Sequence, residues 1–283
     1  MSLSSRDAIA RTTTDSEHSI TQIKLLNPMT SEQECLRTTL RASLLAAFSA
    51  NRRFEDGGLR LFEVGRVYRA QKKALPAEAE MVCGIIAGEA EPSGWQHSKR
   101  IFDFYDIKGL LETILDRIQV PYKLEMANDG GLRAGTQAQF TIDGVPFGVI
   151  GELHPRVARN FDIGEKVYLF EIDLGVLIQK VRPGRAYRPL PRYPAAVRDM
   201  AIVVDSGVTH QQVKDAMAAF PLLKDISLFD VYAGKQLPED KKSLAYRLTF
   251  QSAESTLTDA AVDKVMTEIV ATLATELNAT LRA

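Results

Sequence analysis

Residues 193–283 alternate between short apolar runs and helical patterns in an order that few folds accommodate. In chain order the segments are a β-branched run, a helical pattern, two strand-like runs, a second helical pattern and a short terminal run: Met200–Asp205, Thr209–Phe220, Leu223–Tyr232, Lys242–Gln251, Thr258–Leu277 and Thr280–Arg282. The order β-α-β-β-α-β predicts a ferredoxin-like domain, in which two helices cover one face of an antiparallel sheet. The other face is then free to bind a ligand, so we expect function there.

The alternation within Lys242–Gln251 predicts which side chains reach that open face. Large apolar side chains occupy every second position: Leu244, Tyr246, Leu248 and Phe250. We expect this set to face the helices, because one face of an antiparallel sheet is normally packed on the core. Arg247 and Gln251 then lie on the uncovered face.

Short motifs in the same region carry a more specific resemblance. They are Arg192-Tyr193-Pro194, Val197-Arg198-Asp199, Phe229-Asp230-Val231-Tyr232-Ala233-Gly234, Lys242-Ser243-Leu244-Ala245, Phe250-Gln251 and Thr256-Leu257-Thr258-Asp259. Their types and order resemble the ferredoxin-fold anticodon-binding domain of phenylalanyl-tRNA synthetases, which implies binding to the anticodon arm of tRNA(Phe). Ser255 departs from the family pattern, which carries a basic residue at that point, so one phosphate contact is expected to be absent.

The preceding region, roughly residues 20–180, mixes helical patterns with alternating strands. Helices are expected at Glu32–Asn51 and Asp106–Gln119, each with an apolar stripe. Strands are expected in five runs: Leu59–Tyr68, Met81–Gly88, Gln137–Ile142, Val145–Gly151 and Lys166–Leu174. Asp143-Gly144 fits a tight hairpin turn. The pattern predicts an antiparallel sheet flanked by helices, and the α+β class for the whole chain.

This region also contains motifs that resemble the β chain of the same synthetase. They are Asn27-Pro28, Leu36-Arg37-Thr38-Thr39-Leu40, Leu61-Phe62-Glu63-Val64-Gly65-Arg66-Val67-Tyr68, Asp103-Phe104-Tyr105-Asp106-Ile107-Lys108-Gly109 and Gly151-Glu152-Leu153-His154-Pro155. In that family the region is a noncatalytic copy of the class II catalytic domain, and it packs against the catalytic α chain. The resemblance implies similar packing here. The expected subunit interface is the apolar stripe formed by Leu36, Leu40, Leu44 and Phe48.

A class II catalyst needs an arginine in a glycine-rich junction near the nucleotide, and carboxylates for magnesium. The run Phe62–Arg66 supplies a strand and one arginine, but the apolar run Tyr168–Leu174 stands where the junction is needed. We therefore expect no catalytic residue, metal or cofactor on this chain, and the resemblance implies that ATP and Mg²⁺ bind the α chain. Asp103, Asp106 and Glu112 could form a metal cluster, but Asp106 is well placed to start the following helix, which is the simpler explanation.

Basic residues of the tail are the candidates for RNA contact. Residues 187–283 contain 11 Lys and Arg against 12 Asp and Glu, so RNA binding needs a local patch. The candidates are Arg198, Lys235, Lys241, Lys242, Arg247 and Arg282. Arg247 and Arg282 are expected on the open face; the lysines lie at the hairpin, where they could be merely solvated, and Arg198 could instead pair with Asp199. Phe229 and Tyr232 are available to stack on one or two bases.

The sequence is expected to divide into four segments: a disordered polar lead at 1–19, a class II-like domain at 20–180, a linker at 181–191 and the anticodon-binding domain at 192–283. Cys35 and Cys83 are too few for a disulfide framework and are expected to be free buried thiols in a reducing cytoplasm. No run approaches the ~20 apolar residues of a membrane span.

Together the resemblances imply a noncatalytic β-subunit part of a bacterial-type phenylalanine-tRNA ligase, similar to the C-terminal part of that subunit. Such a chain is expected to bind the anticodon arm of tRNA(Phe) and to pack against the catalytic α subunit of an α2β2 enzyme in the cytoplasm. Two alternatives remain open. One is a free-standing RNA-binding module without a role in aminoacylation. The other is a monomeric organellar-type synthetase, although that enzyme needs the glycine-rich arginine junction missing near residue 170.

Overall fold

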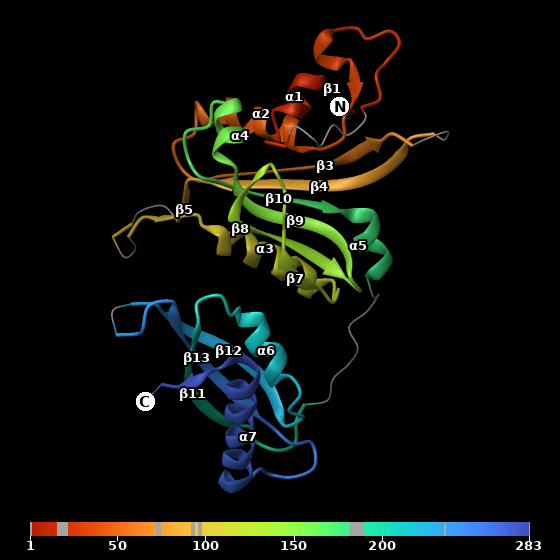
Figure 1. Cartoon of the computed structure of the whole chain (residues 1–283). Helices are drawn as coiled ribbons and strands as arrows, with labels where there is room; N and C mark the ends of the chain where they lie inside the picture. The colour runs from red at the N-terminus through yellow and green to blue at the C-terminus, as the bar shows by residue number, and fades with distance from the viewer. Residues whose placement is uncertain are drawn as a thin grey trace. The chain divides into compact units, whose positions relative to one another are not determined.

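The chain divides into two compact units, Met1–Gly184 and Arg185–Ala283 (Figure 1). The computed structural model describes residues 2–15, 22–71, 75–91, 94–95, 98–181, 190–234 and 236–282. The division between the units falls inside the predicted linker at 181–191. Residues 182–189 of that linker lie outside the described residues.

A six-stranded antiparallel sheet forms the centre of the first unit, with the strand order β3-β4-β10-β9-β8-β7. Its strands are β3 (Leu59–Arg69), β4 (Ala77–Ala87), β7 (Lys123–Met126), β8 (Leu132–Ile142), β9 (Val145–Leu153) and β10 (Val167–Asp173). The five predicted strands are present, and β7 adds an edge strand that the sequence did not reveal. The β8–β9 hairpin turns at Asp143 and Gly144, with φ angles of 53° and 78°, as the Asp-Gly pair predicts.

Helices cover both faces of this sheet (Figure 1). α2 (Arg41–Arg52) packs on one face and α3 (Phe104–Arg117) on the other. Neighbouring residues of β10 show the division, because Leu169 packs in the core under α2 and Phe170 packs in the core under α3. β10 is therefore buried on both faces. Both cysteines are free and buried, as predicted.

Carboxylates at the start of α3 act as helix caps. Asp103 accepts hydrogen bonds from the backbone N–H groups of Tyr105 (2.7 Å) and Asp106 (3.2 Å), while the Asp106 carboxylate accepts from the N–H of Asp103 (2.8 Å). This reciprocal arrangement is a capping box. Asp106 was predicted to start this helix; it lies in the first turn instead, because the helix begins at Phe104 with Asp103 as its N-cap.

The prediction of a disordered lead is wrong for residues 2–15. They contain β1 (Leu3–Ser4), which pairs with β2 (Cys35–Leu36), and α1 (Arg6–Ala10). The Ser5 hydroxyl caps α1 by accepting a hydrogen bond from the N–H of Ala8 at 3.0 Å, and Ile9 is buried. The polar composition of residues 2–15 did not predict β1 and α1, because such short elements need few apolar residues of their own.

The predicted helix Glu32–Asn51 is wrong in its first half, where a short 3₁₀-helix, η1 (Ser31–Gln33), and β2 precede α2. The predicted subunit interface is wrong for the same region. Leu40, Leu44 and Phe48 are 0%, 4% and 0% exposed and belong to the core under α2, while Leu36 lies on β2. Their apolar surface is used by the chain's own sheet and is not left for a partner.

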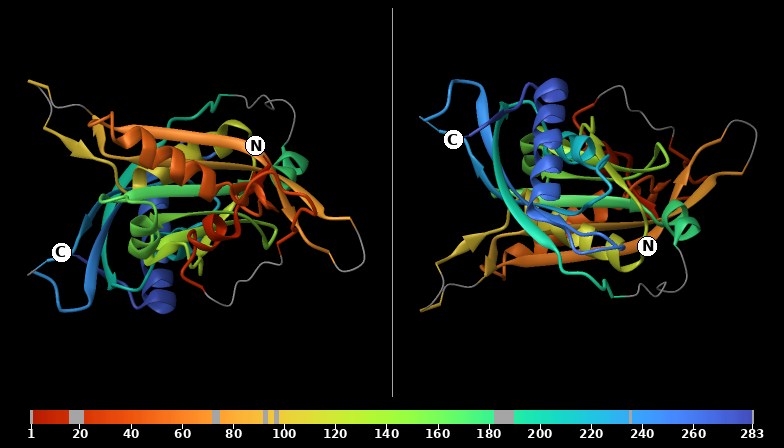
Figure 2. Two further views of the ribbon diagram at one scale, coloured as in Figure 1. Left: turned by 90° about the horizontal axis from the view of Figure 1, so that it is seen from above. Right: turned by 90° about the horizontal axis from the view of Figure 1, so that it is seen from below.

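Four further elements complete the first unit: β5 (Glu89–Glu91), β6 (Arg100–Ile101), α4 (Pro155–Asn160) and α5 (Leu174–Lys180). β5 and β6 pair as a narrow ribbon that projects from the unit (Figure 2). His154 caps α4, since its Nδ1 accepts from the N–H of Arg156 at 3.1 Å. This histidine therefore has a structural role at a loop–helix boundary.

The second unit has the predicted β-α-β-β-α-β order. Its elements are β11 (Ala196–Asp205), α6 (His210–Met217), β12 (Leu223–Tyr232), β13 (Lys241–Phe250), α7 (Asp259–Leu277) and β14 (Thr280–Leu281). The strands pair antiparallel in the order β12-β13-β11-β14. Both helices contribute to one core on one face of this sheet, as Figure 2 shows for α7. The ferredoxin-like prediction is confirmed.

Phe48→Ala is expected to lower the free energy of unfolding of the first unit by about 3–5 kcal/mol, because it opens a cavity in the core under α2. Urea denaturation followed by circular dichroism measures this change. Phe54→Ala, at a side chain that is 88% exposed, is the matched control and should change stability by less than about 0.5 kcal/mol. Equal stabilities of the two variants would contradict the assignment of Phe48 to the core.

Candidate nucleic-acid interface

One face of the second unit's sheet carries the side chains that α6 and α7 do not cover, and we call it the open face. On β13 the large side chains are buried in the core on the helix side: Leu244, Tyr246, Leu248 and Phe250. The side chains between them are small or polar: Ser243, Ala245, Arg247 and Thr249. Their direct partners on β11 are Val203, Ala201, Asp199 and Val197. Arg247 is therefore a long cationic side chain among the small or polar side chains that β13 presents on the open face.

Arg247 is held on the open face by a carboxylate and an aromatic ring. Its Nε donates to Asp199 Oδ1 at 2.9 Å and its Nη2 donates to Asp199 Oδ2 at 2.8 Å. The guanidinium carbon also lies 5.6 Å from the centroid of the Phe229 ring. The hydrogen bond from Arg247 lowers the pKa of Asp199, so both groups are charged near neutral pH. The Arg247 side chain is still 56% exposed, so solvent or a ligand reaches it.

Alternation along β12 places Phe229 on the open face, and a bulge beside it brings Tyr232 to the same face. The register of β12 against β13 shifts between Leu228 and Asp230, which leaves Phe229 as an extra residue in the strand. Leu228 remains on the helix side opposite Tyr246, whereas Phe229 is 55% exposed. An exposed phenylalanine beside an arginine provides an apolar ring face that a nucleic-acid base can stack on.

A second arginine–aromatic pair lies on the same face, nearer the turn between β12 and β13. The guanidinium carbon of Arg282 is 5.0 Å from the centroid of the Tyr232 ring. Ser243, which stands directly opposite Tyr232 in the register, is only 3% exposed. The Tyr232 hydroxyl lies close to Gly234. A Cβ atom at residue 234 would lie 2.7 Å from that hydroxyl. The open face therefore carries two cationic groups, each beside an aromatic ring.

The other predicted basic contacts are placed differently. Lys241 forms an ion pair with Asp205 at 2.7 Å at the edge of the open face. Lys242 stands opposite the buried Val204 and donates to the backbone oxygen of Ser206 at 2.8 Å. It therefore lies on the helix side, and Lys235 lies outside the described residues.

Arg198 also lies on the helix side, opposite Leu248 in the register. It pairs with Asp259 (2.6 Å) and Asp263 (3.5 Å) at the start of α7. The alternative that Arg198 pairs with Asp199 is wrong, because Asp199 points to the opposite face and is taken by Arg247. Of the five candidates that the structure describes, it brings Lys241, Arg247 and Arg282 to the open face.

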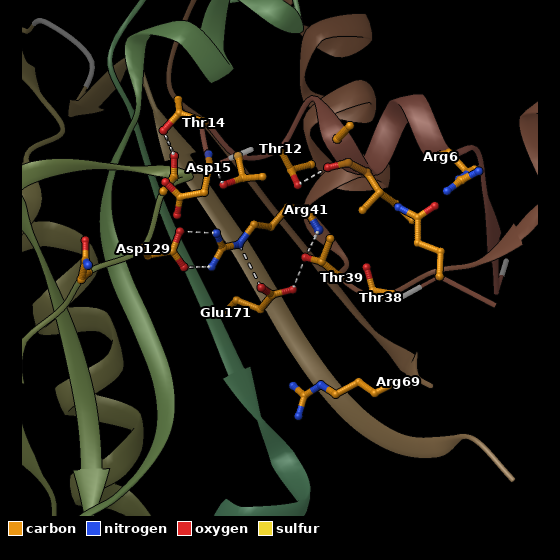
Figure 3. A pocket seen from close by; sticks show the side chains of 16 residues that line it. Arg6, Thr12, Thr14, Asp15, Thr38, Thr39, Arg41, Arg69, Asp129 and Glu171 are labelled. Carbon is orange, nitrogen blue, oxygen red and sulfur yellow. Dashed lines mark hydrogen bonds and ion pairs between the residues drawn. The ribbon is translucent and has the colours of Figure 1, made fainter. Parts of the chain in front are cut away.

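A polar pocket of about 600 Å³ lies in the first unit beside the start of α2 (Figure 3). Arg41 is buried there, and its Nη1 and Nη2 each donate to an Asp129 carboxylate oxygen at 2.7 Å. Its Nε donates to Glu171 Oε2 at 2.9 Å. Burial opposes the charge on Arg41, but the attraction of Glu171 and Asp129 outweighs it and raises the pKa of Arg41. Arg41 is therefore a fixed structural cation.

Glu171 explains why α2 begins where it does. Its Oε1 accepts hydrogen bonds from the Thr39 hydroxyl at 2.7 Å and from the backbone N–H of Leu40 at 3.0 Å. Leu40 is the N-cap residue of α2, and its apolar side chain cannot accept a hydrogen bond from the first N–H groups of the helix. The carboxylate from β10 satisfies an N–H group that the helix itself leaves without a partner. No local sequence signal could have shown this contact.

Asp129 ties the amino-terminal segment to the same cluster. Its Oδ1 accepts from the backbone N–H of Gly131 at 2.8 Å, and the neighbouring Gly130 oxygen accepts from the N–H of Thr14 at 2.9 Å. A Cβ atom at Gly131 would lie 2.5 Å from the backbone oxygen of Thr12. Only glycine fits this close approach, which holds residues 12–14 beside the loop that carries Asp129.

The chemistry of this pocket is mainly structural, because its central charged groups are bound to one another. Within the described ranges, no group of three His, Cys, Asp or Glu side chains is arranged to hold a metal ion. The run Tyr168–Leu174, where a class II catalyst needs its glycine-rich junction, lies mostly in the buried strand β10. The three carboxylate and guanidinium groups thus fix the positions of α2, β10 and the loop after β7.

In the part of the chain that the structure describes, no helix combines the length and apolar character of a membrane span.

Comparisons with known proteins match both units. Residues 1–174 match the model of the phenylalanyl tRNA synthetase beta chain CLM domain, and residues 191–282 match that of the ferredoxin-fold anticodon binding domain. The phenylalanine–tRNA ligase beta subunit of Dehalococcoides mccartyi (strain CBDB1) is 44% identical over 282 residues, which cover 100% of this chain and 35% of that protein. The corresponding subunit of Geobacillus kaustophilus is 38% identical over 265 residues, covering 92% and 33%. The chain thus spans about a third of the length of these curated relatives.

Arg41→Met is expected to destabilise the first unit by about 3–5 kcal/mol, because it leaves the buried Glu171 and the half-buried Asp129 without their cation. Hydrogen exchange of α2 peptides, combined with urea denaturation, measures the loss. Arg66→Met is the matched control, since Arg66 is 58% exposed and its ion pairs with Glu78 and Glu80 contribute at most about 1 kcal/mol. Similar effects of the two substitutions would show that the buried cluster does not hold the unit together.

Proposed function

The chain belongs to the phenylalanyl-tRNA synthetase β-chain family, and from that premise we propose that it serves as a β-subunit part of phenylalanine-tRNA ligase. Its second unit binds the anticodon arm of tRNA(Phe) through the open face. Its first unit is a noncatalytic scaffold that packs against the catalytic α subunit. The α subunit binds ATP and Mg²⁺ and joins phenylalanine to the tRNA in a cytoplasmic α2β2 enzyme.

The two arginine–aromatic pairs are the observation that carries this proposal. Arg247 lies beside Phe229, and Arg282 lies beside Tyr232. Proteins that bind single-stranded loops combine cations, which contact phosphates, with aromatic rings on which bases stack. Cations and aromatic rings are both present on one uncovered face of the four-stranded sheet. A ring and a cation in each pair suit one nucleotide of the anticodon loop.

Charge on the open face argues for a local contact and against general attraction to RNA. Asp199 accompanies Arg247 and Asp205 accompanies Lys241, so the face has no large excess of positive charge. The exposed Arg247–Asp199 pair contributes little to stability, on the order of 0–1 kcal/mol. A phosphate group can therefore replace Asp199 as the partner of one guanidinium edge at a small energetic cost. Weak global attraction also favours discrimination between tRNAs over nonspecific binding.

The first unit supports the role of a scaffold. Its pocket is built around the mutually bound Arg41, Asp129 and Glu171, which leave no free charge at its centre. β10 is buried on both faces and contains neither glycine nor arginine, so it does not supply the glycine-rich arginine junction that a class II catalyst needs. The chemistry of aminoacylation therefore belongs to the partner subunit.

Phe229→Ala and Arg247→Met are each expected to weaken binding to tRNA(Phe) by about tenfold, the size of one stacked base or one cation contact. Fluorescence anisotropy with labelled tRNA(Phe) and a second tRNA measures affinity and its salt dependence. Arg247→Met should also reduce the slope of log affinity against log salt by roughly 0.7–0.9.

Lys264→Met is the matched control, because it removes one exposed cation from α7 on the covered side of the sheet. It should leave tRNA(Phe) affinity unchanged. Equal losses at Lys264 and Arg247 would point to nonspecific charge attraction and contradict the open-face site. Tight tRNA binding without any affinity for the α subunit would favour the free-standing RNA-binding module instead.

A further inference from the structure

One wall of the polar pocket beside the start of α2 is not formed by the Arg41 cluster (Figure 3). Among the described residues, two buried side-chain oxygens have no hydrogen-bond partner, Thr38 Oγ1 and Gln22 Oε1. Both residues line this pocket, and Thr38 is only 7% exposed. A buried polar atom without a partner destabilises a folded protein, so such atoms are few. A ligand that bonds to both oxygens would explain why the two lie in one pocket.

Backbone hydrogen bonds hold Thr38 beside the end of β3. The N–H of Tyr68 donates to the oxygen of Arg37 at 2.9 Å, which ties the residue before Thr38 to the last residues of β3. Arg69 ends that strand and lines the same pocket. Thr38 and Arg69 therefore come from segments that are bonded to each other, although they are far apart in the sequence.

Two other segments reach the pocket through β2. The N–H of Leu36 donates to the oxygen of Ile23 at 2.9 Å, so the residue after Gln22 is bonded to β2. β1 pairs with β2 as well, and α1, which follows β1, begins with Arg6. Four segments thus form one wall of the pocket, which we call the arginine wall: Arg6, Gln22, Thr38 and Arg69.

The arginine wall carries two cations without partners. Within the part of the chain that the structure describes, the guanidinium groups of Arg6 and Arg69 form no ion pair and no hydrogen bond, and both side chains are exposed. Figure 3 shows Asp15 and Asp129 on the other side of the pocket, and Asp129 is bound to Arg41. The arginine wall therefore favours an anion, and its positive charges disfavour a metal ion.

We propose that the arginine wall binds a small oxyanion, a carboxylate or a phosphate, that also carries a hydrogen-bond donor. The oxyanion accepts hydrogen bonds from the guanidinium groups of Arg6 and Arg69 and from the Thr38 hydroxyl. A hydroxyl or amine on the same molecule donates to Gln22 Oε1. The pocket volume of about 600 Å³ lies within the range of small-molecule sites, roughly 300–1,000 Å³, so an organic acid or a phosphate ester fits. The site lies in the first unit and does not depend on the proposed binding of tRNA.

Isothermal titration calorimetry of the full chain with inorganic phosphate and with L-malate, at constant ionic strength, tests the site. Thr38→Val and Arg69→Met are each expected to weaken binding roughly tenfold, which is the size of one hydrogen bond to a charged group. Arg53→Met is the matched control, since Arg53 is exposed and does not line the pocket. It should bind both probes as the unmodified chain does.

Thr38→Val also separates ligand binding from stability. The substitution removes a buried hydroxyl that has no partner. The melting temperature of the unliganded chain should therefore stay equal or rise, while the affinity for the ligand falls. A hydroxyl with a structural role would instead lower the melting temperature when it is removed.

Two matched ions test the hydrogen-bond donor of the ligand. Sulfate resembles phosphate and succinate resembles malate, but near neutral pH neither sulfate nor succinate carries a donor. Each is expected to bind roughly fivefold more weakly than the ion it resembles. Gln22→Met should abolish this preference, because it removes the acceptor Oε1.

The results either support or overturn the site. Binding of either probe that the Thr38 and Arg69 variants weaken supports it, and the probe that binds more tightly identifies the oxyanion as a phosphate or a carboxylate. No binding of either probe at millimolar concentration, or binding that these variants retain, would overturn it. A lower melting temperature of Thr38→Val would show that its hydroxyl is already bonded, and a donor preference that survives in Gln22→Met would contradict the role of Gln22.

Discussion

The guanidinium of Arg247, held between the Asp199 carboxylate and the Phe229 ring, is the contact on which the account of RNA binding depends. It exists because the alternation of β13 sends four large apolar side chains to the helices and leaves Arg247 on the opposite face. Alternation along β12 likewise sends Phe229 to this face, where its ring lies beside Arg247. Sheet geometry thus converts a simple alternation into a cation, a carboxylate and a ring at one exposed place.

Two arginines with similar partners have opposite roles in the two units. Arg41 is buried and bound to two carboxylates, and loss of such a group costs several kcal/mol because it leaves buried charges unpaired. Arg247 is half-exposed, and its ion pair contributes about 1 kcal/mol or less. The first cluster therefore holds a fold together and cannot exchange its partners readily. The second can exchange a carboxylate for a phosphate, which supports the RNA-binding role proposed for the second unit.

Local patterns predicted the second unit well and the first unit less well. The bounds of β12 were predicted as observed, and the side chains that face the core on β13 followed from alternation alone. The start of α2 could not be predicted, because Glu171 reaches Leu40 from 131 positions further along the chain. The apolar stripe on α2 was correctly recognised as a stripe, but periodicity does not say whether its own sheet or a partner covers it.

The candidate site was predictable in outline and not in its contacts. Arg247 and Arg282 were expected on the open face and lie there, whereas Arg198 and Lys242 lie on the helix side. The role of Asp199 depends on the register between β11 and β13, and that of Tyr232 on a bulge in β12, and neither is visible in residue types. The most direct measurement is an NMR titration of the chain with the anticodon stem-loop of tRNA(Phe), following the arginine Nε–H and aromatic ring signals. Shifts of Arg247, Arg282, Phe229 and Tyr232 are predicted; shifts confined to α6 and α7 would contradict the open face as the RNA-binding surface.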